Sequence, residues 1–202
     1  MEAEYKPLAA APLQAGAGYH QPASFSPQPV GAASPAVEVM TDLRLVPAAT
    51  IDPDTHIDVA NQAMIARGVR SLLVVGRDGD VAGVVTARDI LGERPLQVVT
   101  KRGLKHEDVK VSDIMTPRHE IEVLNMADVL RAKVGAVVET LKRTGRQHAL
   151  VVDRDAVTNR QMVRGIFSAS QVARQLGIAL HTTEVALTFA QIEAVISQHA
   201  GV

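Results

Sequence analysis

The stretch Gly83-Val84-Val85-Thr86-Ala87-Arg88-Asp89 joins a strand-forming run to the start of a helix. Its valines are β-branched and suit a buried strand, whereas Ala87 and Arg88 favour a helix. Thr86 stands at the junction and Asp89 follows three residues later, which is the spacing of a capping box. A helix start of this kind also presents backbone N–H groups beside two oxygen-bearing side chains. The stretch therefore predicts a helix cap or a ligand site.

A second stretch, Gly165-Ile166-Phe167-Ser168-Ala169-Ser170-Gln171, repeats this pattern. The elements before it also recur in the same order: Met40-Thr41 as Met115-Thr116, the helix 57–66 as 133–142, and the strand 72–75 as 149–152. In the first copy an Asp78-Gly79 turn joins two apolar runs and predicts a β-hairpin. The chain thus contains an internal duplication, whose two units are expected to pack together about a pseudo-two-fold axis.

The duplication divides the chain into four expected regions. Residues 1–38 are rich in Ala, Pro, Gly, Gln and Ser and are predicted to be a disordered tail. Residues 39–110 hold the first repeat and a connector, and residues 111–178 hold the second repeat. Residues 179–202 are predicted to form a C-terminal helix. Its apolar stripe packs either on its own domain or on a partner; the stripe consists of Val185, Phe189, Ile192 and Ile196.

Composition excludes several classes of function. With 21 basic and 22 acidic residues and 2% aromatics, the 202-residue chain offers neither excess positive charge nor a stacking platform for nucleic acid. It has no cysteine and no apolar run long enough to span a membrane, which favours a cytoplasmic protein. No histidine pair has metal-ligand spacing, and no serine has a nucleophile context, so neither a metal site nor an enzyme is predicted.

Taken together, the repeated motifs resemble the paired cystathionine β-synthase (CBS) domain, or Bateman module, over about residues 39–177. The resemblance rests on the paired Met-Thr starts, the apolar strand with its Asp-Gly turn, and the sequence Gly-Val-Val-Thr-x-x-Asp. It implies an α/β (α+β) fold of two β-α-β-β-α repeats. It further implies a regulatory module, commonly dimeric, that binds AMP, ATP or S-adenosylmethionine between the repeats and has no catalytic cofactor.

The resemblance also assigns site residues. Asp89 matches the aspartate that accepts the ribose hydroxyls, Thr86 matches the hydroxyl near the phosphate, and Arg70 falls beside the phosphate-contacting positions. The expected adenine slot is aliphatic and includes Ala49, Leu73 and Val84. A second, weaker site is expected at Ser168, Gln171, His148 and Arg146.

Gln171 departs from the family pattern because it cannot offer two carboxylate oxygens to a ribose. Ser168 and Gln171 still have capping-box spacing, so the second helix is expected to keep its cap while the ribose contact is lost. The main alternative to a ligand sensor is a structural or scaffolding dimer that binds no ligand. In either case the protein partner is not indicated by the sequence.

Overall fold

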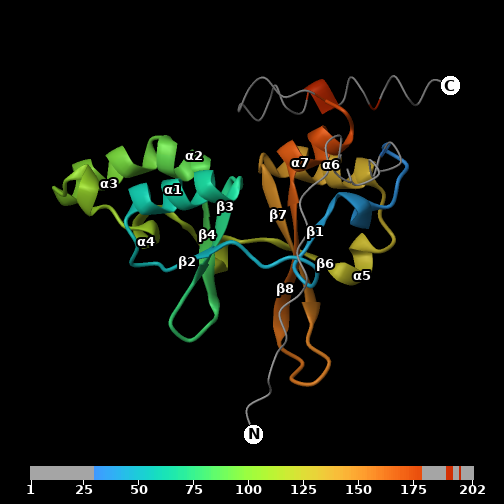
Figure 1. The fold of residues 1–202 in the computed structure, drawn as a ribbon, viewed down its shortest axis with the longest axis horizontal. Coiled ribbons are helices and arrows are strands. Elements are labelled where there is room, and N and C mark those ends of the chain that lie inside the picture. The colour runs from blue at the N-terminus through green and yellow to red at the C-terminus, as the bar shows by residue number, and fades with distance from the viewer. Residues whose placement is uncertain (1–29, 179–189, 193–195, 197–202) are drawn as a thin grey trace, which may run out of the picture.

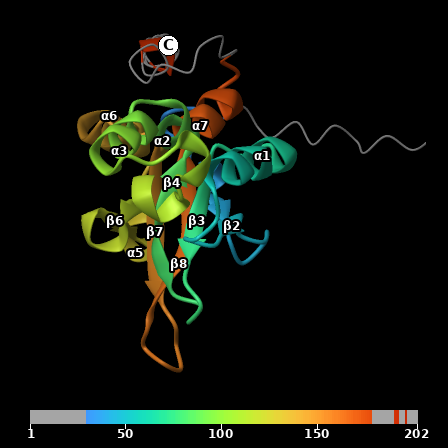
Figure 2. The same cartoon turned by 90° about the vertical axis from the view of Figure 1, so that its left-hand side faces the viewer.

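The computed structural model describes residues 30–178, 190–192 and 196 (Figure 1). Two four-stranded sheets form the two halves of the molecule. Figures 1 and 2 both place most helices toward one end of the strands and the two hairpin turns at the other end. No helix among the described residues has the length and apolarity needed to cross a membrane.

The first sheet has the strand order β2-β3-β4-β5. Its strands are β2 (Thr50–Ile51), β3 (Ser71–Val75), β4 (Val81–Thr86) and β5 (Thr116–Pro117). The helices of this half are α1 (Ile57–Arg67), α2 (Ala87–Leu91), α3 (Arg94–Arg102), η2 (His106–Asp108) and α4 (Val111–Ile114). The strand, helix, hairpin and helix predicted for the first repeat are confirmed. Helix α3 lies in what the sequence indicated only as a connector.

The second sheet has the order β1-β8-β7-β6. Its strands are β1 (Thr41–Asp42), β6 (Val123–Asn125), β7 (His148–Arg154) and β8 (Gln161–Ser168). The helices of this half are η1 (Ala36–Val39), η3 (Arg118–Glu120), α5 (Met126–Val129), α6 (Val134–Thr144) and α7 (Ala169–Gln175). The order β5-β4-β3-β2 of the first sheet corresponds strand by strand to the order β1-β8-β7-β6 of the second. The two sheets therefore have the same topology, which confirms the duplicated α/β fold.

The two repeats exchange their first strands. β1 pairs antiparallel with β8 of the second repeat, and β5 pairs antiparallel with β4 of the first repeat. Glycines allow both close approaches: a Cβ built on Gly83 would lie 2.6 Å from the Thr116 carbonyl oxygen, and one built on Gly165 would lie 2.5 Å from Met40 Sδ. The Met-Thr pair of each repeat therefore lies against the glycine of the other repeat, and this contact occurs twice in the chain.

The buried cores follow this exchange. Val109, Val111 and Ile114 belong to the core of the first half, although the sequence placed them at the end of the connector and the start of the second repeat. Ala36 and Val39 belong to the core of the second half. The expected boundaries at 38/39 and 110/111 therefore do not coincide with the two packed units.

The two ends of the described chain both pack on the second half. Residues 30–38, which we expected to lie in the disordered tail, include the fully buried Ala36, whose N–H donates to the Ala132 carbonyl at 3.0 Å. Ile192 of the expected C-terminal helix is fully buried in the same core, and Ile196 packs against it. These two positions of the stripe therefore pack within the chain. Val185 and Phe189, like residues 1–29, lie outside the described residues.

Candidate ligand pocket between the repeats

The junction between β4 and α2 is a complete capping box. Thr86 donates its backbone N–H and its hydroxyl to Asp89 Oδ2, at 2.8 and 2.7 Å, and the Asp89 N–H donates to Thr86 Oγ1 at 3.3 Å. The sequence predicted a helix cap or a ligand site at this junction, and the structure confirms the helix cap. Because the box fixes the rotamer of Asp89, its second oxygen has a defined direction.

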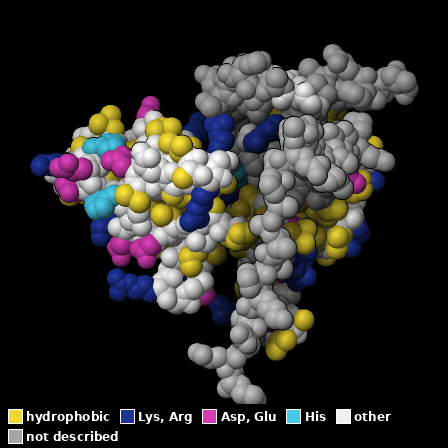
Figure 3. Space-filling model, in the orientation of Figure 1, with side chains coloured by type: hydrophobic (Ala, Val, Ile, Leu, Met, Phe, Trp, Pro, Cys, Tyr) yellow, Lys and Arg dark blue, Asp and Glu magenta, His cyan; other side chains and the backbone are white. Residues whose placement is uncertain are grey.

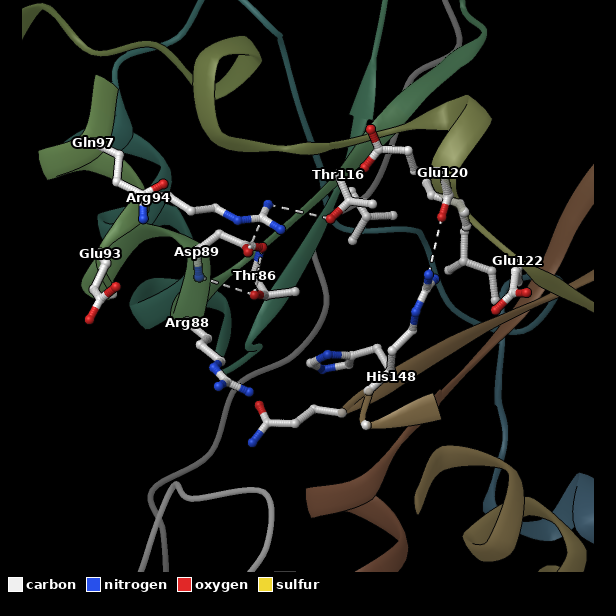
Figure 4. A pocket seen from close by; sticks show the side chains of 17 residues that line it. Thr86, Arg88, Asp89, Glu93, Arg94, Gln97, Thr116, Glu120, Glu122 and His148 are labelled. Atoms are coloured by element: carbon white, nitrogen blue, oxygen red, sulfur yellow. Dashed lines mark hydrogen bonds and ion pairs between the residues drawn. The ribbon is translucent and has the colours of Figure 1, made fainter. Parts of the chain in front are cut away.

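That second oxygen has a partner that the sequence did not suggest. Arg94 Nη1 lies 3.0 Å from Asp89 Oδ1, and the side chain of Asp89 is only 12% exposed. The same Arg94 nitrogen donates to the Ile114 carbonyl at 2.7 Å and approaches Thr116 Oγ1 at 3.5 Å (Figure 4). Arg94 therefore ties the capped aspartate to the segment that leads into the exchanged strand β5.

Asp89 and Arg94 line a pocket of about 770 Å³, a volume typical of small-molecule sites. Both repeats contribute to it. From the first half and β5 come Val84, Thr86, Arg88, Asp89, Gly92, Glu93, Arg94, Gln97 and Thr116. From the second half come Glu120, Ile121, Glu122, Gly145, Arg146, Gln147, His148 and Leu150. Its wall thus has an apolar part at Val84, Ile121 and Leu150 and a polar part around Asp89.

Positive charge and a neutral histidine occupy one side of the pocket. Arg88 and His148 point toward one another in Figure 4, and the Arg88 guanidinium has no hydrogen-bond or ion-pair partner among the described residues. Burial, and secondarily the charge of Arg70, lower the pKa of His148 from 6.5 to about 4. His148 is therefore neutral at pH 7 and can act there as a hydrogen-bonding group and not as a charge.

The residues predicted for two separate sites are redistributed. Thr86, Asp89 and Val84 of the first expected site share the pocket with Arg146 and His148 of the second. The resemblance implies clefts between the repeats, with the residues of each repeat assigned to a separate site, whereas this pocket combines the junction of one repeat with the strand start of the other. Arg146 Nη2 donates to the Glu120 carbonyl at 3.1 Å on this side of the pocket.

The other predicted residues do not line this pocket. The Arg70 carbonyl accepts the N–H of Ala87 at 2.9 Å, Leu73 is buried in β3, and the Ala49 carbonyl accepts the Leu73 N–H at 2.9 Å. Ser168 and Gln171 lie at the start of α7. These residues therefore lie outside the lining of this pocket, and their contacts with a ligand stay predictions.

The predicted cap of the second helix is wrong. Ser168 makes no side-chain capping bond, and its hydroxyl lies 3.0 Å from the hydroxyl of Ser170. A hydroxyl two residues along competes for the group that would otherwise cap the helix. The second junction has therefore lost both the carboxylate and the cap.

Sequence reasoning missed Arg94, Thr116 and Glu122. Arg94 lies between Glu93 and Pro95 at the start of α3, in a segment that the sequence indicated only as a connector, so nothing in the local pattern singled it out. The described residues contain no cluster of three or more His, Cys, Asp or Glu side chains that could hold a metal ion.

Comparison with known proteins finds a family that the first repeat resembles. Residues 36–95 match the family model described as CBS domain. An inosine-5'-monophosphate dehydrogenase of Thermoplasma acidophilum is 27% identical over 112 residues, covering 55% of this chain and 21% of that protein. An uncharacterised protein of Methanopyrus kandleri is 31% identical over 67 residues, covering 33% of this chain and 34% of that protein. The chain thus spans about a fifth and a third of these two relatives.

A solved structure supports the fold assignment. An uncharacterised conserved protein from Pyrococcus horikoshii superposes with a TM-score of 0.53 at 24% identity, covering 76% of this chain and all of that one. The family match covers the first repeat, and the second half repeats its topology strand for strand. The first repeat is therefore similar to a CBS domain, and the second half has the same strand topology.

Proposed function

We propose that this chain is a cytoplasmic regulatory module that binds one adenosine-containing ligand, such as AMP, ATP or S-adenosylmethionine, in the pocket between its repeats. The observation that carries the proposal is that the capped Asp89 of one repeat shares a pocket of about 770 Å³ with Arg146 and His148 of the other. The module is proposed to be non-catalytic, to form a homodimer and to act on a protein partner.

The pocket offers suitable chemistry to each part of such a ligand. Val84, Ile121 and Leu150 provide an apolar wall for the adenine. Asp89 provides carboxylate oxygens for ribose hydroxyls, since charged acceptors make the stronger hydrogen bonds. Opposite these groups, Arg88, whose guanidinium has no partner within the described part of the chain, and the neutral His148 suit a phosphate or carboxylate.

Regulation follows from the position of the pocket between the repeats. A ligand that contacts both repeats binds more tightly when they are held at one separation, and it shifts the population toward that arrangement. Nucleic acid is not proposed as a partner, because acidic and basic side chains are mixed over the face of the first half in Figure 3.

Thermal unfolding with added nucleotides tests the proposal. AMP, ADP, ATP and S-adenosylmethionine are each added to the wild type, and at least one is expected to raise the Tm, since binding to the folded state alone stabilises it. Asp89→Ala should abolish this rise. Failure of every adenosyl ligand to raise the Tm of the wild type would contradict the proposal.

Asp113 supplies a matched control. Asp113 Oδ2 accepts the Lys110 N–H at 2.9 Å in a second capping arrangement, and it pairs with Arg102 at the far end of α3, outside the pocket. Asp113→Ala should therefore lower the Tm as Asp89→Ala does while leaving the rise caused by the ligand intact. An equal loss of the rise in both variants would mean that Asp89 acts only as a cap.

One observation favours the scaffold alternative. Both oxygens of Asp89 already have partners within the chain, so the aspartate is satisfied without a ligand. A scaffolding dimer predicts no Tm rise with any adenosyl compound and an unchanged dimer in Asp89→Ala. Both functions predict an intact dimer in Asp89→Ala, which sedimentation velocity checks, so the thermal experiment with adenosyl compounds separates them.

A further inference from the structure

The hydrogen bonds already made by Asp89 limit what a ribose can add. An ionised carboxylate has about four lone-pair positions. The Thr86 N–H and the Thr86 hydroxyl both donate to Oδ2, and Arg94 pairs with Oδ1 at 3.0 Å. Three positions are therefore in use, and one remains on Oδ1, whereas a ribose diol has two hydroxyls to donate.

Arg94 holds its position for a reason other than the stability of its own helix. It is the first residue of α3, the end at which the helix dipole disfavours a positive charge. Its guanidinium instead joins Asp89 to the Ile114 carbonyl, at 2.7 Å, near the exchanged strand β5. With its side chain 46% exposed, Arg94 has room to swing away from Asp89.

We propose that Arg94 competes with the ribose diol for Asp89, and that it thereby sets both the affinity of the pocket and its discrimination between ribose and deoxyribose. This inference rests on the proposed function of the pocket. While Arg94 stays, Asp89 accepts one ribose hydroxyl, and AMP and 2'-deoxy-AMP bind alike. Once Arg94 leaves, Asp89 accepts both hydroxyls, and only AMP gains.

The competition also connects the pocket to the exchanged strand. When a diol displaces Arg94, the Ile114 carbonyl and the Thr116 hydroxyl lose the same donor. Residues 114–116 lead directly into the pairing of β5 with β4. Occupation of the pocket therefore loosens the hydrogen bonds of this segment, which gives a ligand one route to alter the contact between the repeats.

Calorimetric titration with AMP and 2'-deoxy-AMP tests the inference in the wild type and in Arg94→Met, a side chain of similar length without donors. Arg94→Met should bind AMP about tenfold more tightly, which is the effect of one further hydrogen bond to a charged group, and 2'-deoxy-AMP within about twofold of wild type. The ratio of the two affinities is the diagnostic quantity, because a general loss of stability changes both ligands alike.

Arg102→Met is the matched control. Arg102 ends the same helix and also pairs with a capping aspartate, Asp113, outside the pocket, so its replacement should leave the ratio unchanged. If Arg94→Met does not fold, Arg94→Gln, which keeps a donor on a shorter chain, replaces it with the same expected direction.

The outcomes separate the two proposals. In one outcome, the wild type binds AMP, Asp89→Ala does not, and Arg94→Met shows an unchanged affinity ratio or weaker AMP binding. This outcome would overturn the competition and leave the proposed function standing. Absence of AMP and 2'-deoxy-AMP binding in wild type and Arg94→Met alike would overturn the competition, and the same absence with ADP, ATP and S-adenosylmethionine would overturn the proposed function as well.

Discussion

The two strand-to-helix junctions have the same backbone plan and different chemistry. At each, the first N–H of the helix donates to the carbonyl just before the first strand of the hairpin, Ala87 to Arg70 at 2.9 Å and Ala169 to Gln147 at 2.8 Å. The first junction adds the Thr86–Asp89 box, whereas Ser168 has no capping bond. The backbone contact and the buried strands are therefore sufficient to form the junction, because the second junction forms without a carboxylate. The carboxylate of Asp89 is not required for the fold of the first junction on this comparison.

The exchanged strands differ in the same way. β1 is held on β8 by a bidentate ion pair, with Arg164 Nε and Nη2 at 2.8 and 2.7 Å from the two oxygens of Asp42. These hydrogen bonds from Arg164, followed by that from the Arg44 N–H, lower the pKa of Asp42 to about 2. Its counterpart in β5 is Pro117, and there Arg94 reaches the segment from α3. Only the second arrangement links the exchanged strand to the pocket.

The largest expected difference between the repeats depends on pH. In the second hairpin, His148 pairs with the junction residue Ser168. In the first hairpin, Ser71 occupies the equivalent position and pairs with Thr86. Because His148 titrates near 4 in the fold and near 6.5 when unfolded, only the unfolded chain binds this proton between those values. The contribution of His148 to the free energy of unfolding is fully present above pH 6.5. Lowering the pH toward 4 reduces that free energy by at most about 3 kcal/mol.

Urea unfolding at pH 7.0 and 4.5 checks this contribution. His148→Ser, which gives the second hairpin the residue of the first, should lose less stability between the two conditions than the wild type does. Equal losses in the two proteins would mean that the imidazole is solvated and titrates normally.

The two close glycines should respond unequally to a methyl group. Gly83→Ala meets the Thr116 carbonyl oxygen at 2.6 Å as well as Met115, and the backbone cannot move without separating β5. We expect a cost of about 2 kcal/mol. Gly165→Ala meets only the flexible side chain of Met40 and should cost less than about 1 kcal/mol.

Double variants sharpen this test. Met40→Ala should remove the cost of Gly165→Ala, and Met115→Ala should leave most of the cost of Gly83→Ala. Urea unfolding of the four single and two double variants measures both couplings. Full recovery of Gly83→Ala by Met115→Ala would show that the strand backbone is not the obstacle.

The smallest expected difference concerns the caps. Thr86→Ala should lower the free energy of unfolding by about 1 kcal/mol because it removes a capping hydroxyl. Ser168→Ala should change it by less than about 0.5 kcal/mol, since no capping bond is lost. Chemical denaturation measures both, and a larger cost at Ser168 would contradict the described geometry.

The sequence predicted the elements that carry strong local signals. β-branched runs, the Asp-Gly turn and helical spacing indicated both hairpins and the helices α1 and α6, and repetition indicated the duplication. The exchange of β1 and β5 was not predictable in this way, because two-residue strands have no periodicity. Pairing across repeats also decided the pocket, so Asp89 was recognised from its motif while Arg94 and the partnership with His148 were not.

One pocket, built by Asp89 of the first repeat and His148 of the second, is proposed to bind the ligand. Calorimetric stoichiometry with AMP tests it most directly, because the two junctions would give two sites if they were equivalent. We expect one AMP per chain in the wild type and none in Asp89→Ala. Two sites per chain, or one site that survives Asp89→Ala, would contradict it.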